Sequence, residues 1–276
     1  MTVAPMAVAA LALACAFGGS LGGIGGATLL VPVLLALGVD PRAAAPIGLV
    51  TVAAGSLASA SRPLQDGLVH HRLGLTVELA ASSGAVAGAL LSASVPEVWL
   101  ARVLGIAALI GAVAALARTG IRNRPDPLFG GESAGEWPGT LGGQYSLDGE
   151  MVPYQARNLP GGLAASLVAG VVAGLSGVGG GFLKTPAMSE IMKVPVKVAA
   201  ATTTFTLGIT ATTGLVVYAE QGRVEPHDAA AALLGALVGG VLGARTQARI
   251  HATTARRVTG GLLLVVAAVV IGRTLT

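Results

Sequence analysis

The feature that most constrains the fold is a glycine-rich motif that occurs twice. Residues 21–32 (LGGIGGATLLVP) align without a gap with residues 175–186 (LSGVGGGFLKTP), at an offset of 154. The alignment continues beyond the motif and pairs Pro41 with Pro195. After one inserted residue, it pairs Gly84 with Gly239 and Arg102 with Arg257. Compositional bias alone would not align prolines and arginines as well as glycines. We infer that the chain consists of two copies of one ancestral unit.

The composition predicts that these units lie in a lipid bilayer. The chain is 53% hydrophobic and only 11% charged, whereas a soluble domain is typically about 25% charged. Eight apolar stretches occur, most near the roughly 20 residues that a helix needs to cross the hydrocarbon core. They lie at 5–38, 43–60, 73–95, 99–117, 160–192, 197–219, 229–244 and 255–275. The expected fold class is therefore an all-α, polytopic membrane protein.

A polar stretch rich in Gly, Pro and charge separates the two units. This pattern predicts three parts: repeat 1 at 1–118, a linker outside the membrane at 119–159, and repeat 2 at 160–276. Within the linker, residues 142–150 are expected to form a small hairpin.

The distribution of positive charge decides between parallel and inverted repeats. If every apolar stretch crosses once, Lys and Arg divide eight against eight. If the first and fifth stretches instead fold back at their glycines, the division is twelve against four. The second model is favoured, so we predict inverted repeats, a cytoplasmic linker and both termini outside.

The two glycine motifs are the predicted transport site. In lipid every backbone N–H and C=O needs a partner, so a broken helix must lie within protein or line a wet cavity. Secondary transporters use such breaks, with half-helix N-termini that point at anionic substrates. The alternative is close helix packing through small residues. The candidate residues are Gly22, Gly23, Gly25 and Gly26, together with Ser176, Gly177, Gly179, Gly180 and Gly181.

Lys184 is a second candidate, because it lies deep in an apolar stretch one turn after Gly181. Its counterpart in the first repeat is Leu30, so the repeat architecture does not require a charge there. A lone cation within the membrane is costly and is by default a functional candidate. We predict that it holds an anion; the alternative is that it snorkels to an interface.

Hydroxyl groups could complete an oxyanion site. Thr202, Thr203 and Thr204 follow soon after the second motif and are the preferred candidates, ahead of the later threonines of the same segment. Thr51 and Ser56 are weaker candidates in the first repeat.

The acidic residues and histidines are expected at surfaces. Glu78 and Glu190 lie in apolar segments, where either could carry a coupling proton, but both are expected near the membrane surface. The histidines are expected in solvated loops: His70, His71, His227 and His251. We find no nucleophile–base pair, metal-ligand spacing or Walker-type loop, so an enzyme, a metal site and a cofactor are not expected.

These motifs resemble the sulfite exporter TauE/SafE family of membrane permeases. The resemblance rests on residues 21–32 and, more closely, on 175–186; residues 194–205 (VPVKVAAATTTF) are similar to the stretch that follows in that family. One departure is that the family often has Gly-Thr-Ser after the first hairpin, where this chain has PIG at 46–48. The resemblance implies movement of a small anion, often sulfite or an organosulfonate, across the cytoplasmic membrane.

The expected function is therefore a secondary transporter, and an exporter, of a small anion such as sulfite or an organosulfonate. An anion channel and a carrier of small organic carboxylates stay open as alternatives. The expected partners are the anion, the bilayer of the inner (cytoplasmic) membrane, and a coupling proton or other ion. Small-residue faces such as Gly235, Gly239 and Gly243, at helical spacing, could join two protomers in a homodimer or could simply pack the bundle. A nucleic-acid partner is not expected, since no basic run with interleaved aromatic residues occurs.

Overall fold

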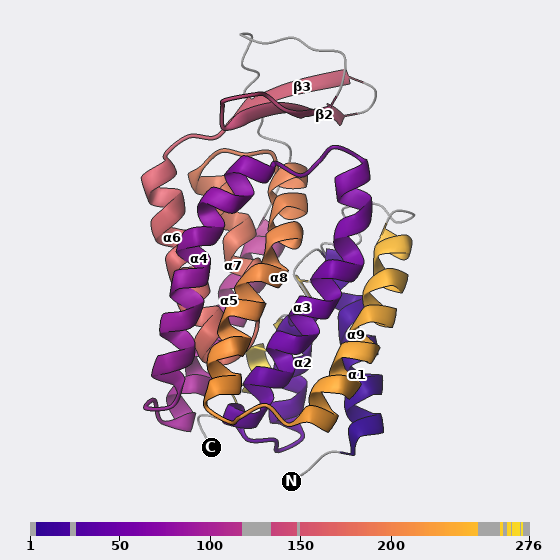
Figure 1. Cartoon of the computed structure of the whole chain (residues 1–276), viewed down its shortest axis with the longest axis vertical. Helices are drawn as coiled ribbons and strands as arrows, with labels where there is room; N and C mark the ends of the chain where they lie inside the picture. The colour runs from indigo at the N-terminus through magenta and orange to yellow at the C-terminus, as the bar shows by residue number, and fades with distance from the viewer. Residues whose placement is uncertain are drawn as a thin grey trace.

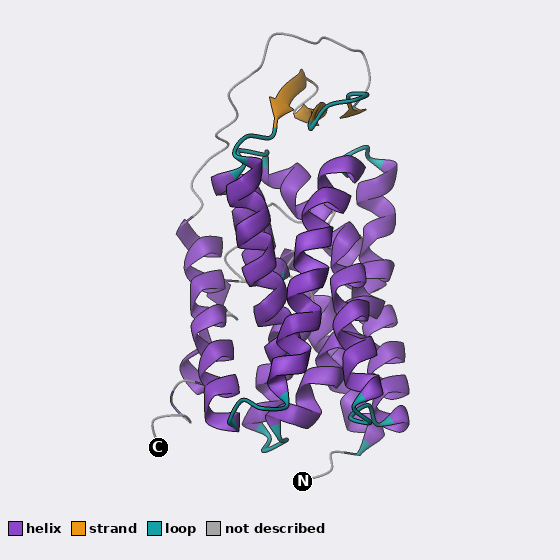
Figure 2. Cartoon of the chain, turned by 60° about the vertical axis from the view of Figure 1, so that its left-hand side comes forward, coloured by secondary structure: helices purple, strands orange, loops and turns teal. Residues whose placement is uncertain are grey.

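The protein is a bundle of long helices with a small β-sheet at one end (Figures 1 and 2). The computed structural model of the chain describes residues 4–22, 26–117, 134–147, 150–247, 260–261, 264–265, 267–270 and 272. Gly23 and Gly25 of the first motif lie outside the described residues, as does most of the eighth apolar stretch.

Five of the described helices are long and apolar enough to cross a membrane. They are α3 (Pro41–Gln65), α4 (His71–Ser92), α6 (Leu159–Ser176), α8 (Val196–Glu220) and α9 (Pro226–Gln247). Their outward faces are apolar while their inward faces carry charge: Leu79 is 75% exposed, whereas the adjacent Glu78 is 3% exposed. A soluble protein would show the opposite pattern, so the bundle is that of a multi-pass membrane protein.

The first apolar stretch forms two helices, α1 (Pro5–Gly22) and α2 (Ala27–Ala36). Gly26 precedes α2 and packs so closely on α1 that a Cβ there would lie 2.4 Å from the Cα of Ala16. Since Ala16 lies before the end of α1, the chain has turned back at the glycine motif. Asp40 then caps α3, where its side chain accepts a hydrogen bond from the backbone N–H of Arg42 at 2.7 Å.

The fifth apolar stretch also turns back at its glycines. Helix α6 ends at Ser176, and Gly177, Gly179 and Gly180 after it adopt left-handed conformations with φ of 74°, 80° and 68°. Such values are natural for glycine and strained for other residues. The chain continues as α7 (Gly181–Pro186) and a π-helical turn, η1 (Ala187–Ile191). The end of η1 lies beside the start of α6, because the N–H of Arg157 donates to the carbonyl of Met192 at 2.8 Å.

The sheet lies beyond one end of the bundle, and α1 begins at the opposite end (Figure 1). It consists of β1 (Gly135–Glu136), β2 (Gly142–Leu147) and β3 (Glu150–Gln155), antiparallel in that order. The pairing of β2 with β3 confirms the hairpin predicted at 142–150. Tyr145 and Tyr154 anchor the sheet, since they pack with Leu73 and Met192 in one buried cluster.

Helices of the two halves meet through glycines. In α4, a Cβ on Gly84 would lie 2.2 Å from the carbonyl oxygen of Leu167 in α6. In α9, a Cβ on Gly239 would lie 2.2 Å from the carbonyl oxygen of Leu13 in α1. Such contacts let helix backbones approach closely in a membrane. Gly235 and Gly243 also pack on α1, so the face predicted for a homodimer is used within the chain.

Helix α5 (Glu97–Ala117) completes the described helices of the first half. It begins after the turn that follows α4, and Leu100 of α5 is buried. Leu100 lines a small pocket that also touches α2 and the end of α6 through Val31, Leu35 and Ser176.

Candidate functional site

The centre of the candidate site is a buried ion pair between Lys184 and Glu78. Lys184 lies on the first turn of α7 and is 1% exposed. Its Nζ forms an ion pair with Oε2 of Glu78 in α4. The same Nζ donates to Oγ1 of Thr206 at 2.8 Å and to Oγ1 of Thr210 at 3.4 Å, both in α8. Three helices thus position the cation.

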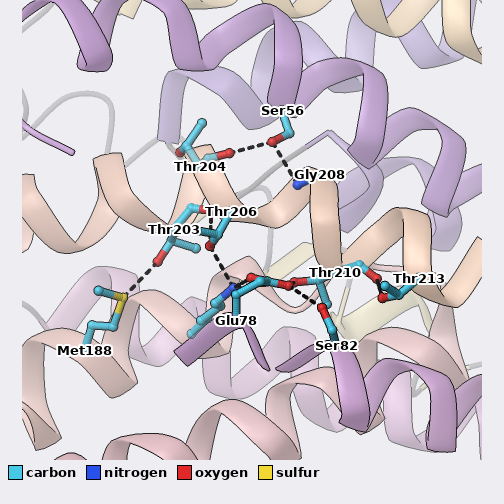
Figure 3. Close-up of polar contacts among 11 residues, drawn as sticks. Ser56, Glu78, Ser82, Met188, Thr203, Thr204, Thr206, Gly208, Thr210 and Thr213 are labelled. Atoms are coloured by element: carbon cyan, nitrogen blue, oxygen red, sulfur yellow. Dashed lines mark hydrogen bonds and ion pairs between the residues drawn. The ribbon is translucent and has the colours of Figure 1, made fainter. Parts of the chain in front are cut away.

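Hydroxyl groups also hold the carboxylate of Glu78 (Figure 3). Its Oε1 accepts hydrogen bonds from Thr210 at 2.5 Å and from Ser82, one turn further along α4, at 2.8 Å. Every charged atom of the pair therefore has a partner. A buried pair of this kind contributes little net stability, because both charges have left water. Its presence in the bundle core is better explained by function.

This arrangement corrects two sequence-based expectations. Lys184 was expected to be a lone cation, and it is paired. Glu78 was expected near the membrane surface, and it is buried. The start of α4 suggested a surface position, but α7 and α8 cover this turn of the helix. Glu190 is exposed, as expected.

The preferred threonines have other partners. Oγ1 of Thr202 accepts from the backbone N–H of His70 at 2.9 Å, and Oγ1 of Thr203 lies 3.5 Å from the sulfur of Met188. The carbonyl of Thr204 accepts from Ser56 at 2.5 Å. The threonines at the ion pair are instead Thr206 and Thr210. Their spacing of four residues, which places two hydroxyls on one helix face, was the signal that could have found them.

The weaker candidates of the first repeat are bonded within and between helices. Thr51 donates to the carbonyl of Ile47 in its own helix at 2.9 Å. Ser56 joins α3 to α8, because its hydroxyl also accepts from the N–H of Gly208 at 3.0 Å (Figure 3). Neither hydroxyl contacts the ion pair.

Helix α3 packs against both hairpins. Gly48 of α3 lies between the two hairpins: a Cβ there would lie 2.3 Å from Val31 of α2 and 2.4 Å from the carbonyl oxygen of Gly177. The hydroxyl of Ser176 donates to Val172 in its own helix at 2.6 Å. The hydroxyl of Thr185, next to Lys184, is buried without a partner. The second break thus packs against α3 and leads directly into the helix that carries Lys184.

His70 lies at the end of the bundle that carries the sheet. It was expected in a solvated loop, and it is buried instead. It is fully buried, and its ring contacts all three strands: Nδ1 lies 2.9 Å from Oε2 of Glu136, Nε2 lies 3.1 Å from the carbonyl of Gly142, and Tyr154 packs edge-on. Burial lowers the pKa of His70 below its ordinary value of 6.5, while the carboxylate of Glu136 opposes that shift. His71 and His227 are exposed; His251 lies outside the described residues.

The lowered pKa of His70 makes docking of the sheet sensitive to acid. Because the folded protein holds His70 neutral more strongly than the unfolded chain does, stability is full above pH 6.5 and falls as the pH drops through the lowered pKa. We expect the melting temperature to fall as the pH is lowered below 6.5. His70→Asn, which keeps a helix-capping side chain, should flatten this dependence. The control His71→Asn should leave it unchanged; equal slopes in all three proteins would contradict the assignment.

A multi-pass bundle with a partnered cation in its core, beside a helix broken at glycines, defines the class of polytopic membrane transporters. The chain belongs to the sulfite exporter TauE/SafE family, whose model matches residues 8–270. It is also similar to the probable membrane transporter protein YunE of Bacillus subtilis (strain 168), with 28% identity over 248 residues that cover 86% of each chain. No solved structure matches the chain significantly.

Proposed function

We propose that this protein is a secondary transporter that carries a small anion, such as sulfite or an organosulfonate, outward across the cytoplasmic membrane. The observation that carries the proposal is the buried ammonium of Lys184, held among threonine hydroxyls in the bundle core. A small oxyanion needs one positive charge and several directed donors, and charge-assisted hydrogen bonds supply both. The family's description as a sulfite exporter supports the anion class and the outward direction.

In this proposal the anion binds at Lys184, and Thr206 and Thr210 take the role first given to Thr202–Thr204. The hydroxyl of Thr185, the residue after Lys184, has no partner and is a further donor for the anion. The glycines at 177–181 serve as the flexible joint that lets α7 move against α6.

We infer that the repeats 1–118 and 160–276 are inverted around the site. The two hairpins support this, because α1 begins at the end away from the sheet whereas residues 159–192 begin and end beside it. The glycine contacts support it as well. Gly84 packs on Leu167 and Gly239 packs on Leu13, and these are equivalent positions with the halves exchanged. A pseudo-two-fold axis produces such reciprocal contacts, and inverted repeats are common in transporters.

The topology can be tested by labelling single cysteines from either side of the membrane. In a Cys15→Ala background, Thr2→Cys should react with an impermeant maleimide added outside intact cells. Ala134→Cys, in the predicted cytoplasmic linker, should react only after the cells are permeabilised. Reaction of both positions from the same face would rule out the inverted arrangement.

The substrate class can be tested by a thermal-shift screen of sulfite, sulfate, thiosulfate, methanesulfonate and small carboxylates on the purified protein. A ligand at 100 times its dissociation constant stabilises by about 2.7 kcal/mol. We expect sulfite or methanesulfonate to raise the melting temperature and carboxylates to have less effect. Accumulation of the bound anion against its gradient in proteoliposomes would then exclude a channel, which can only dissipate a gradient.

A further inference from the structure

We propose that Glu78 is the proton-binding residue of this transporter: it takes up one proton each time Lys184 binds the anion, so that anion and proton cross together. This inference rests on the proposed function, because it concerns what happens at Lys184 when the substrate arrives.

The first step follows from the geometry of the pair. The ammonium of Lys184 already contacts Oε2 of Glu78 and the hydroxyls of Thr206 and Thr210. An ammonium has three N–H donors, and all three are used. In the proposed site Thr206 and Thr210 stay as donors to the anion, so an anion that binds Lys184 takes the place of the Glu78 carboxylate.

The second step concerns the charge that is left behind. Among the described elements packed against α4, helix α6 carries no ionisable residue, and α7 carries Lys184 alone. The ionisable residues of α8 are Lys197, which is exposed near its start, and Tyr218 and Glu220 at its far end. At the sheet end of α4, Glu136 faces His70, Arg72 is exposed, and the exposed His71 packs on Phe205. No second cation in the described part of the chain faces Glu78.

A displaced carboxylate would therefore be a buried anion next to a second anion, with one cation between them. Desolvation and the neighbouring negative charge both favour the protonated form of a carboxyl group. A proton on Glu78 gives the substrate the full charge of Lys184 and leaves the core neutral. No bond is broken in this step; Glu78 gains one proton from water on the side from which the anion enters.

The hydroxyls around Glu78 suit both protonation states. In the paired state, Ser82 and Thr210 donate to Oε1. A hydroxyl is both a donor and an acceptor and can rotate. A protonated Glu78 can therefore donate to one of the same two hydroxyls, and its buried O–H keeps a partner in either state.

Two forms of the core then carry no uncompensated charge. In one, Glu78 pairs with Lys184; in the other, a monovalent anion pairs with Lys184 and Glu78 is protonated. Only these forms can change conformation within the low-dielectric bundle at low cost. One anion and one proton move together without net charge, so the flux responds to the gradients of the anion and of pH. Outward transport then requires that the anion gradient exceed the opposing pH gradient.

The test uses the full chain in proteoliposomes with [14C]methanesulfonate, a sulfonate that does not titrate near neutral pH, and with the membrane potential clamped by potassium and valinomycin. With the interior one pH unit more alkaline, the wild type should accumulate methanesulfonate about tenfold. Glu78→Gln should exchange internal for external methanesulfonate yet accumulate it less than about twofold under the same gradient. Glu190→Gln, at the exposed carboxylate, should behave as the wild type.

A wild-type measurement keeps the inference testable if Glu78→Gln does not fold. An inward methanesulfonate gradient, with equal pH on both sides, should acidify the lumen as reported by entrapped pyranine. Exchange by the wild type without acidification, or pH-driven accumulation by a folded Glu78→Gln variant, would overturn this inference and leave the proposed function standing. No exchange of methanesulfonate by the wild type would overturn the organosulfonate substrate and the inference with it.

Discussion

Lys184→Met is expected to abolish anion exchange and to lower the free energy of unfolding by about 3–5 kcal/mol. The variant removes the positive charge that attracts the anion. It also leaves the carboxylate of Glu78, which is 3% exposed, buried without its cation. Removal of one partner of a buried ion pair is far more costly than removal of both. Exchange of labelled sulfite in proteoliposomes and thermal melting in detergent measure the two effects separately.

The double variant Lys184→Met/Glu78→Leu is the matched control for the stability effect. With both charges replaced by apolar side chains of similar size, no charge is left unpaired in the core. We expect it to melt close to the wild type, since such replacements are often neutral or stabilising. It should still fail to exchange anions. Full exchange by either variant would show that Lys184 does not bind the anion. If the double variant melts as low as the single one, lost packing rather than an unpaired charge explains the loss of stability.

The parts of the fold that could be predicted from the sequence are those that depend on local backbone chemistry. Glycines that adopt left-handed conformations end a helix wherever it packs, so the break at 177–180 was visible in the sequence. The turn between Leu147 and Glu150 was predictable for a similar reason, since Asp-Gly favours a hairpin. The sequence showed that Gly84 and Gly239 are equivalent positions, but it did not show which helices they pack against.

The pairing of Glu78 with Lys184 was not predictable in the same way. The two residues are 106 positions apart, and they meet only because α7 folds back beside α4 and α8. Near the start of its helix, Glu78 looks like a residue at the membrane surface. The threonines show a related limit: seven occur between 202 and 213, and only the tertiary structure shows which of them face Lys184.

The two proposed repeats differ at the ion pair, which occurs in only one of the two aligned sets of positions. The position of Lys184 corresponds to Leu30 in the first repeat, and Leu30 is buried as completely. The position of Glu78 corresponds to Leu233 in the second repeat, which is 42% exposed. The aligned counterpart of the ion pair therefore consists of two leucines and carries no charge. In the proposed repeats the scaffold occurs twice and the ion pair once, which fits one anion bound per chain rather than two.

Gly170→Val is expected to separate α4 from α6 and so to disrupt the site without altering any of its residues. A Cβ at Gly170 would lie 1.9 Å from the carbonyl oxygen of Ala81, one turn along α4 from Glu78. The obstacle is backbone, which cannot rotate away as a side chain can. Overpacking of a well-packed core costs about 1–3 kcal/mol, and a clash with backbone belongs at the upper end of that range.

The effect on transport follows from the connection of α6 to Lys184. Gly180, which precedes α7, packs on the carbonyl oxygen of Ala169, so a displaced α6 carries α7 with it and moves Lys184 away from Glu78. We therefore expect Gly170→Val to lose most sulfite exchange along with stability. Gly55→Ala is the matched control, since a Cβ there meets nothing within 4 Å. It should stabilise α3 by roughly 0.5–1 kcal/mol and keep exchange. If Gly170→Val melts and exchanges as Gly55→Ala does, close contact of α4 with α6 is not what holds the ion pair in place.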